Sequence, residues 1–484
     1  MVLESIDYKK IFYYFEEISN IPRGSGNNKQ ISDYLVNFAK EHNLSYIQDE
    51  ALNVIITKEA SAGYESCPTM ILQGHMDMVC EKRADIEHDF MTQGLELMVE
   101  GDYIFANGTT LGGDNGIAVA SALAILDDDS LVHPRLEVII TTDEEIGLLG
   151  AAALDTSSLQ GKYMINLDSE EEEVVITSCA GGLTAHCTLP ISYKKAEGKK
   201  LTVTIKGLLG GHSGAEIDKN RVNADILAGR LLLDLKKFDF ELISVSGGGK
   251  DNAIPREAQI EFVVEEEQIY NFINEIKFLS EKYKTEYRTN EPDLTFVTAQ
   301  GEKKEYNVFD EESKKKVVLF LVSTPNGIQT MSANIEGLVE SSLNLGVLKV
   351  TEAGLEAGYS VRSSIRSYKW FLSDKLEQLV TFLGGSYSYA GEYPGWEYKK
   401  SSKLRDIYAA AYKEVTGLDI KIEAIHAGLE CGIIAEKMND LDIIAIGPNM
   451  KDIHTSEERL SISSTKRVYD VVVAALKNFC EATR

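Results

Sequence analysis

The sequence predicts an α/β fold in which one domain is interrupted by another. Apolar segments of strand length alternate with segments of helical periodicity over residues 1–185 and again over 396–484. This alternation is typical of a sheet flanked by helices. Residues 186–395 change to a strand–helix–strand–strand–helix–strand order. At 484 residues the chain is also too long for one ordinary core. We therefore expect a discontinuous α/β domain with an inserted α+β domain.

The first segment is expected to supply most of a mixed, mostly parallel sheet and its covering helices. Apolar residues at helical spacing predict a helix over 6–19 and a second one from the loop at 23–27 to about residue 42. Small residues over 117–126 predict a further helix. Strands are expected over 46–56, 70–79, 136–142 and 163–167, with an edge hairpin around 101–102.

The inserted segment is expected to contain two related lobes. Its strand and helix order over 200–298 recurs, without the first strand, over 313–392. After Pro394 and Gly395 the first pattern returns. The elements expected there are a helix over 404–415, a strand from 420, a strand over 442–446 and a C-terminal helix.

Composition narrows the classes of partner. The formal charge of −27 repels nucleic acid and anionic lipid, so neither is an expected partner. No apolar run is long enough to cross a bilayer, and the N-terminus does not resemble a signal peptide. The six cysteines are scattered without a CxxC pair, which argues against a cysteine zinc site and favours a reducing cytoplasm. We expect any metal to be held by His, Asp and Glu.

Polar residues gather after the predicted strands, where the site residues of α/β proteins usually lie. The histidines and carboxylates at these positions are His75, Asp77, Asp114, Glu144, Glu145, Asp168 and His454. Two histidines with several carboxylates and no thiolate suit two borderline divalent cations such as zinc. Read singly, Asp168 could belong to an exposed acidic loop and His454 to the surface.

Within this set the spacing suggests roles. His75 and Asp77 are two apart on a predicted strand and therefore share a face, as in a histidine oriented by a carboxylate or a bonded core pair. Asp114 follows glycines that allow close approach, and its two oxygens suit a bridging ligand, although it could also form a turn or helix cap. Adjacent Glu144 and Glu145 should diverge in extended chain. One ligand and one general base is the economical assignment, with a solvated helix start as the alternative.

Seven motifs together resemble the dizinc peptidase family that includes aminoacylases, succinyl-diaminopimelate desuccinylase and carboxypeptidase G. In chain order they are GHMDMV (74–79), LGGDNG (111–116), TDEEIG (142–147), NLDSE (166–170), GGHSG (210–214), HAGLECG (426–432) and IHT (453–455). They span nearly the whole chain, and no ligand position departs from the family pattern. The HAGLECG run favours the dipeptidase branch over the deacylases.

The resemblance implies a centre of two Zn²⁺ ions per subunit, with Mn²⁺ or Co²⁺ as substitutes. The implied ligands are His75 and Asp168 for one ion, Glu145 and His454 for the other, and Asp114 as the bridge. In family members a cis peptide bond follows the bridging aspartate. Asp77 would orient His75. Glu144 would be the general base, which takes the proton from the attacking water and returns it to the leaving amine.

Residues 186–395 match the family's lid domain, which carries dimer contacts in many members, so a homodimer through this domain is expected. The candidate for stabilising the oxyanion is His212, with a packed loop histidine as the alternative. Arg362 and Asn252 could bind the substrate's terminal carboxylate, although Arg362 could equally form a structural ion pair. The loop around His426 and Glu430 is expected to line the substrate pocket.

The expected function is a metal-dependent dipeptidase that hydrolyses unblocked dipeptides, Xaa-His and broader, in the cytoplasm. The partner would then be a small peptide substrate. One alternative is an N-acyl amino acid deacylase of the same family. The other is a catalytically silent relative that binds or scaffolds.

Overall fold

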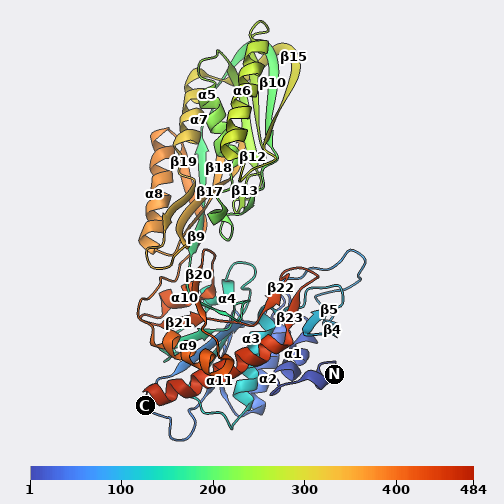
Figure 1. Ribbon diagram of the computed structural model, residues 1–484, viewed down its shortest axis with the longest axis vertical. Coiled ribbons are helices and arrows are strands. Elements are labelled where there is room, and N and C mark those ends of the chain that lie inside the picture. The colour runs from blue at the N-terminus through green and yellow to red at the C-terminus, as the bar shows by residue number, and fades with distance from the viewer. Residues whose placement is uncertain (1, 484) are drawn as a thin grey trace. The chain divides into compact units, whose positions relative to one another are not determined.

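A computed structural model describes residues 2–483 and divides the chain into two compact units. The first unit contains residues 1–178, 398–424 and 429–484, and the second contains 179–397 and 425–428. Figure 1 shows the elements of both units along the chain. The predicted boundary between 185 and 186 lies inside strand β9 (Gly181–Leu189), which pairs along its whole length with β18 (Gly354–Ser363).

The first unit is built on an eight-stranded mixed sheet with the order β1-β2-β6-β3-β7-β21-β8-β20. Its central strands β6 (Leu136–Thr141), β3 (Met70–His75), β7 (Tyr163–Asn166) and β21 (Asp442–Ala445) are parallel neighbours. The outer pairings of β1 (Ser45–Gln48), β2 (Val54–Lys58) and β8 (Val174–Cys179) are antiparallel, and β20 (Lys421–Ile425) is the last strand. The predicted α/β class with a mixed sheet is confirmed.

Two element boundaries differ from the sequence expectation because local turns interrupt the patterns. Helix α1 (Ile11–Ser19) starts after Lys10, which takes the left-handed conformation at φ 64°, and the short helix η1 (Glu4–Ile6) before it ends at Ile6. The segment predicted as one strand over 46–56 is a hairpin of β1 and β2. The carboxylate of Asp49 accepts the N–H of Asn53 at 2.8 Å and stabilises the turn between them.

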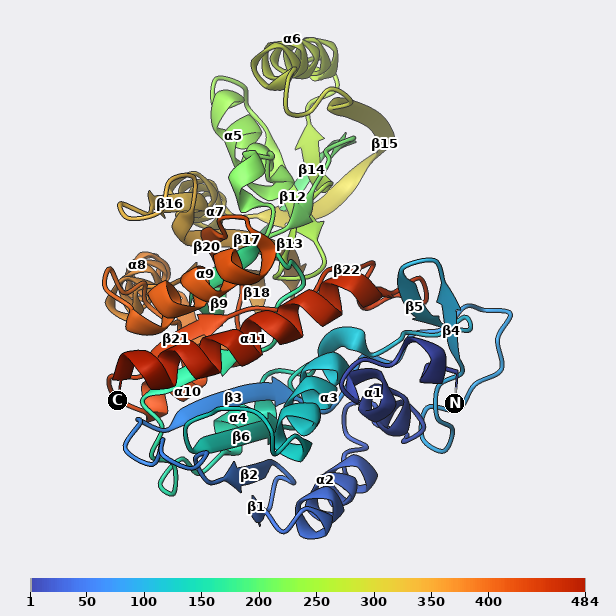
Figure 2. The ribbon, with the colours of Figure 1, turned by 60° about the horizontal axis from the view of Figure 1, so that its bottom comes forward.

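The helices of the first unit pack mainly on one apolar layer. Buried residues of β2, β3, β6 and β7 form a single cluster with α1, α2 (Lys29–Glu41), α3 (Gly113–Asp127), α9 (Lys403–Thr416) and α11 (Ile462–Thr483). Figure 2 shows α1, α3 and α11 near the sheet. The short helices α4 (Leu149–Ala153) and α10 (Glu430–Lys437) are joined by Lys437, whose Nζ donates to the carbonyls of Ala151 and Leu154 at 2.8 Å.

A small four-stranded sheet, β22-β23-β5-β4, completes the first unit. Strands β4 (Leu97–Glu100) and β5 (Tyr103–Ala106) form the predicted edge hairpin. Strand β23 (Arg459–Ser461) pairs with β5 and with β22 (Met450–Lys451). The loop 452–458 between β22 and β23 is therefore anchored at both ends, and it carries His454.

The second unit contains a nine-stranded sheet with two halves of matching order. One half runs β15-β10-β14-β12 and the other runs β19-β9-β18-β17, joined through β12 and β17, with β16 (Gly327–Met331) beside β17. The second half lacks a first strand in local sequence because β9, which precedes the first half, supplies it. The strand bounds are β10 Tyr193–Lys206, β12 Glu241–Gly248, β14 Ala258–Val264, β15 Thr295–Phe309, β17 Val339–Thr351 and β19 Ser386–Tyr393.

The helices of the second unit occur in the expected order: α5 (Ala224–Asp234), α6 (Ile269–Tyr287), α7 (Glu311–Ser323) and α8 (Arg366–Phe382). They share one apolar cluster with the sheet. Strands β11 (Gly211–His212) and β13 (Ala253–Ile254) form a separate two-stranded sheet, and the helix η2 (Ile217–Lys219) follows β11. Within residues 2–483, no helix combines the length and the apolar character that a membrane span requires.

Asp225, in the first turn of α5, is a buried carboxyl group without a partner. It is 0% exposed, and neither carboxylate oxygen has a hydrogen-bond partner in the described part of the chain. Burial raises the pKa of Asp225 well above its usual value. Because the folded pKa exceeds the unfolded one, the group's contribution to stability is fully present below the unfolded pKa and is lost as the pH rises through the folded pKa.

We therefore expect Asp225→Asn to stabilise the protein by about 1 kcal/mol or more at alkaline pH, where the wild type must bury a charge or retain a proton. The gain should be smaller at about pH 4, near the ordinary pKa of an aspartate, than at about pH 8.5. Thermal unfolding followed by circular dichroism at both pH values measures it, with the exposed Asp239→Asn as control. A gain that does not depend on pH would contradict this account of Asp225.

Candidate metal centre

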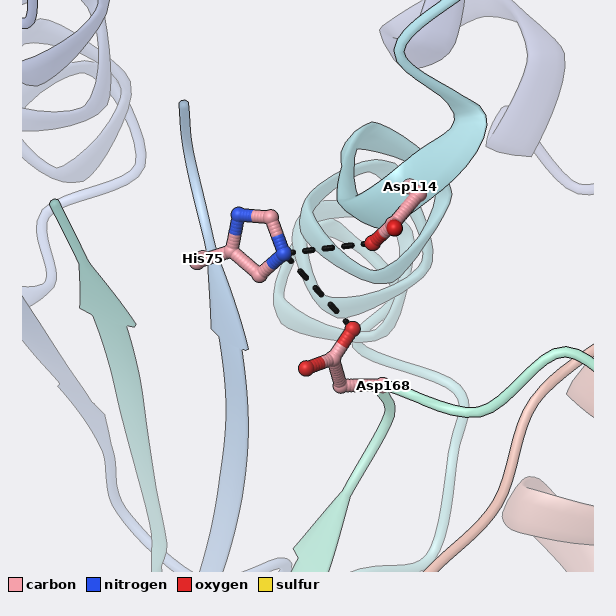
Figure 3. A group of neighbouring side chains, drawn as sticks. All are labelled: His75, Asp114 and Asp168. Atoms are coloured by element: carbon pink, nitrogen blue, oxygen red, sulfur yellow. Dashed lines mark hydrogen bonds and ion pairs between the residues drawn. The ribbon is translucent and has the colours of Figure 1, made fainter. Parts of the chain in front are cut away.

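The first cluster of candidate ligands joins the ends of two parallel strands to the start of a helix. His75 is the last residue of β3, Asp168 follows β7, and Asp114 lies at the start of α3. Nε2 of His75 lies 3.2 Å from Oδ1 of Asp114 and 3.6 Å from Oδ1 of Asp168. Figure 3 shows the three side chains converging on one point. Their ligand atoms all lie within 4.8 Å of one another, which suits one shared cation.

A second cluster forms around His454 in the loop 452–458. Its Nε2 lies 3.1 Å from Oδ2 of Asp114 and 3.1 Å from Oε2 of Glu145. His454 takes a left-handed backbone conformation at φ 61°, which is costly for a residue with a Cβ. Strain of this kind persists where the surrounding structure holds a functional side chain in place.

Asp114 belongs to both clusters. Its Oδ1 faces His75 and its Oδ2 faces His454, so the two oxygens of one carboxylate point to two different imidazoles. This is the arrangement that a bridging ligand between two cations requires. The peptide bond between Asp114 and Asn115 is cis, as the family resemblance implied.

Glu144 and Glu145 do not diverge as expected for extended chain. The chain turns at Asp143, whose φ is 50°, and both carboxylates lie in a cluster with His75 whose ligand atoms are within 4.8 Å of one another. Oε2 of Glu144 is 3.9 Å from Nε2 of His75, and Oε2 of Glu145 faces His454. The pair also precedes α4 rather than forming its first turn, so the helix-start alternative is wrong.

Asp77 holds the surrounding backbone as well as His75. The strand expected over 70–79 is shorter in the structure and ends at His75, so Asp77 lies just beyond β3 rather than on it. Its Oδ1 is 3.3 Å from Nδ1 of His75. The carboxylate also accepts the N–H groups of Glu144 at 3.1 Å and Glu145 at 3.4 Å, and the hydroxyl of Ser25 at 2.8 Å. One fully buried aspartate thus fixes the imidazole and the turn that carries both glutamates.

The charges of the cluster are unbalanced. The ion-pair partners of its four carboxylates, from Asp114, Glu144, Glu145 and Asp168, are only two imidazoles, those of His75 and His454. Burial and the neighbouring carboxylates raise the pKa of Glu144 to about 9. Hydrogen bonds that the imidazole donates to the carboxylates of Asp114 and Glu145 raise the pKa of His454 to about 10.

The donor set fits divalent cations. It offers imidazole nitrogens and carboxylate oxygens, the ligands that zinc takes in the absence of thiolates. Oε1 of Glu145 is buried and has no hydrogen-bond partner in the described residues. Buried carboxylates are stable only when they are paired or bind a metal. The seven residues predicted at strand ends are therefore all brought together in the first unit.

Three residues near the centre were not predicted. Arg23 is 2% exposed and donates to the carbonyls of Met76 at 3.1 Å and Gly112 at 2.5 Å, so it links the two ligand-bearing segments. Ser25 bonds Asp77. Glu458 accepts backbone N–H groups at the start of α3. Sequence gives little signal for these contacts, since each joins positions far apart in the chain.

The predicted substrate residues His212, Arg362 and His426 lie in the second unit. A Cβ placed on Gly214 would lie 3.1 Å from Cε1 of His212, 3.2 Å from Nε of Arg362 and 2.7 Å from the carbonyl oxygen of His426. The side chains of His212 and Arg362 and the backbone of His426 therefore surround one glycine. The Asn252 carbonyl accepts the N–H of Ser213 at 2.9 Å, and the exposed Asn252 precedes the strand that pairs with His212.

Two of these residues, Arg362 and His426, have buried ring or guanidinium nitrogens without a hydrogen-bond partner in the described residues. Nη1 of Arg362 donates to the hydroxyl of Tyr393 at 3.0 Å, but its buried Nε has no partner in the described residues. His426 accepts or donates through Nε2 to Ser342 at 2.7 Å, and its buried Nδ1 is also without a partner there. Burial and Arg362 lower the pKa of His426 to about 3. The donors therefore suit an anionic group.

Glu430 occupies a different position from the predicted pocket wall. It is 0% exposed, and its Oε2 accepts from Gln73 at 2.5 Å and from Thr141 at 2.6 Å beneath the first cluster. Burial and the Asp168 carboxylate raise the pKa of Glu430 to about 7 against the lowering influence of His75. In the HAGLECG segment, Glu430 is the first residue of α10 and is buried there. Its side chain therefore lies in the core of the first unit.

One carboxylate faces an imidazole at the end of β3 and another in the loop 452–458, within an α/β unit that an α+β unit interrupts; this arrangement suits a metallopeptidase. The chain belongs to peptidase family M20/M25/M40, whose model matches residues 71–478.

Three of the proteins that the chain resembles match it over nearly its whole length. The cytosol non-specific dipeptidase of Escherichia coli (strain K12) is 34% identical over 478 residues, which are 98% of this chain and 98% of that protein. The crystal structure of aminoacylhistidine dipeptidase from Vibrio alginolyticus superposes with a TM-score of 0.92 at 33% identity, covering 98% and 96% of the two chains. Aminopeptidase PepT from Bacillus cereus, at 15% identity, covers 98% and 99% with a TM-score of 0.55 and shares the fold.

Proposed function

We propose that this protein is a dipeptidase with two Zn²⁺ ions, which hydrolyses unblocked dipeptides, including Xaa-His dipeptides, in the cytoplasm. The observation that carries the proposal is Asp114, whose two oxygens face His75 and His454 separately. The proposed ligands are His75 and Asp168 for one ion, Glu145 and His454 for the other, and Asp114 for both. The names of the Escherichia coli and Vibrio alginolyticus relatives support a dipeptide substrate.

The proposed chemistry is hydrolysis with Glu144 as general base. Divalent cations, when bound, lower the pKa of water and polarise a carbonyl group. Glu144 lies in the cluster without facing His454, so its carboxylate is the one left to accept the proton of the attacking water. It then returns the proton to the leaving amine. Asp77 holds the imidazole of His75 and the backbone of Glu144 in fixed positions for this proton transfer.

His212 is proposed to donate a hydrogen bond to the developing oxyanion. Its Nδ1 accepts the N–H groups of Gly214 at 3.2 Å and Ala215 at 3.0 Å. An accepting Nδ1 places the proton of a neutral imidazole on Nε2. Burial and Arg362 lower the pKa of His212, which favours this neutral form. The tautomer needed for a donor is thus set by the local backbone.

Arg362 is proposed to bind the terminal carboxylate of the substrate, aided by Asn252 and His426.

We expect Arg362→Ala to raise KM for free dipeptides about 10-fold to 100-fold, since a charge-assisted hydrogen bond to a carboxylate contributes about 1.5–3 kcal/mol. Dipeptide amides should be affected much less. Steady-state kinetics on both substrate types measures the difference, with Arg230→Ala, which breaks a surface pair with Glu286, as the control. Equal effects on both types would assign Arg362 to structure alone.

We also propose that residues 186–395 carry the substrate-binding contacts of the lid and the contacts of a homodimer. Sedimentation analysis tests the homodimer.

The substrate proposal is tested by assaying Xaa-His dipeptides, other dipeptides and N-acetyl amino acids on the zinc-loaded protein. Hydrolysis of the free dipeptides is expected. Turnover of the acyl compounds alone would favour a deacylase, and turnover of neither would favour a binding protein.

A further inference from the structure

Glu458 is a buried carboxylate on the same loop as His454. It ends the loop 452–458, is 2% exposed, and is followed directly by β23, which is anchored on β5. Its neighbour Glu457 is exposed. The two adjacent glutamates therefore have opposite environments, although the sequence alone does not distinguish them.

The carboxylate of Glu458 binds the backbone that leads into Asp114. Its Oε2 accepts the N–H groups of Leu111 at 2.8 Å and Gly112 at 3.0 Å. Its Oε1 accepts those of Gly113 at 2.8 Å and Asp114 at 3.3 Å. Four successive N–H groups thus point at one side chain, and hydrogen bonds to an ionised acceptor are stronger than neutral ones.

The approach is close enough to depend on glycine. A Cβ on Gly113 would lie 3.2 Å from Oε1 of Glu458, which is tighter than an ordinary contact. A side chain at this position would push the carboxylate away from the N–H groups. The glycine at position 113 therefore allows the close contact with Glu458.

The link between Asp114 and His75 is held by other residues. Asn115 accepts the N–H of His75 at 3.2 Å through its side chain and donates to the carbonyl of Leu167 at 3.0 Å. Arg23 binds the carbonyl of Gly112. None of these contacts involves the loop of His454. Within the described residues, Glu458 is the side chain that ties this loop to the Asp114 backbone by several bonds.

We infer that Glu458 is a positioning residue that sets the separation of His454 and Asp114 and so assembles the second metal site. This inference rests on the proposed two-metal function. His454 itself is poorly held, because its side chain is 47% exposed and its backbone is strained. Removing the Glu458 contacts lets the loop move relative to Asp114. The site of His75, Asp114 and Asp168 keeps its own supports.

The test is a Zn²⁺ titration of the metal-free protein by calorimetry, comparing the wild type with Glu458→Gln. Glutamine keeps the size of the side chain but places an amide group against the backbone N–H donors. Glu457→Gln is the matched control one residue away. We expect the second equivalent to bind about 10-fold to 100-fold more weakly in Glu458→Gln, with the first equivalent unchanged, as found for residues that orient metal ligands.

A second readout separates positioning from folding. At saturating Zn²⁺ the kcat of Glu458→Gln for a dipeptide should recover towards the wild-type value with KM unchanged. Equal weakening of both equivalents, or wild-type affinity for both, would overturn the inference. If Glu458→Gln does not fold, Glu458→Asp is titrated instead and judged by the same outcomes. A wild type that binds no Zn²⁺ would overturn the proposed function, and with it this inference, before any variant is compared.

Discussion

Glu144→Gln is expected to lower kcat for dipeptides about 100-fold to 10,000-fold, the range that a general base contributes. Glutamine keeps the shape of the side chain and cannot accept the proton of water. Because Glu144 is proposed as the base and not as a ligand, the variant should retain both equivalents of zinc. The comparison of kcat with metal content distinguishes the two roles of the adjacent glutamates.

The control for Glu144→Gln is Glu171→Gln, an exposed acidic residue beyond the Asp168 segment. Glu145→Gln should show the opposite pattern, with weaker metal binding accompanying the loss of activity. A Glu144→Gln protein that loses zinc, or one whose kcat falls less than about 10-fold, would mean that base and ligand are wrongly assigned.

Asp114→Ala is expected to abolish both zinc binding and turnover. One oxygen of this carboxylate faces each imidazole, so its removal takes a ligand from both sites at once. His454→Ala, which affects only one cluster, should instead lose one equivalent.

Metal analysis after dialysis measures the stoichiometry of both variants. The N–H groups that bind Glu458 remain in Asp114→Ala, so the metal-free variant should still fold, which circular dichroism can verify. If Asp114→Ala retains either equivalent at wild-type affinity, Asp114 does not bridge two ions.

The ligand cluster could be predicted from sequence because it follows from one geometric rule. The carboxyl ends of parallel strands meet at one edge of a sheet, and His75 and Asp168 end two neighbouring strands there. His454 was the harder case, since it lies in a loop far along the chain. It was a candidate among the polar residues after the predicted strands, and the motifs shared with the family implied that it is a ligand. The small sheet of β22, β23 and β5 explains its position.

What sequence could not supply were contacts that depend on side-chain direction or on long-range pairing. The turn at Asp143 brings two adjacent glutamates to one place, although extended chain would separate them. Glu430 points into the core, although the loop around it was expected to line the substrate pocket. Strand β9 belongs with elements that come much later in the chain, so the second lobe seemed to lack a strand. In each case the interaction that decides the structure leaves no trace in the local pattern of apolar and polar residues.

The most direct test of the two-metal dipeptidase is a titration of metal-free protein with Zn²⁺ during hydrolysis of an Xaa-His dipeptide. The account predicts no hydrolysis without metal and a rate that reaches its maximum when both sites, which share Asp114, are filled. Full activity in the metal-free protein, or maximal activity with a single equivalent bound, would contradict it.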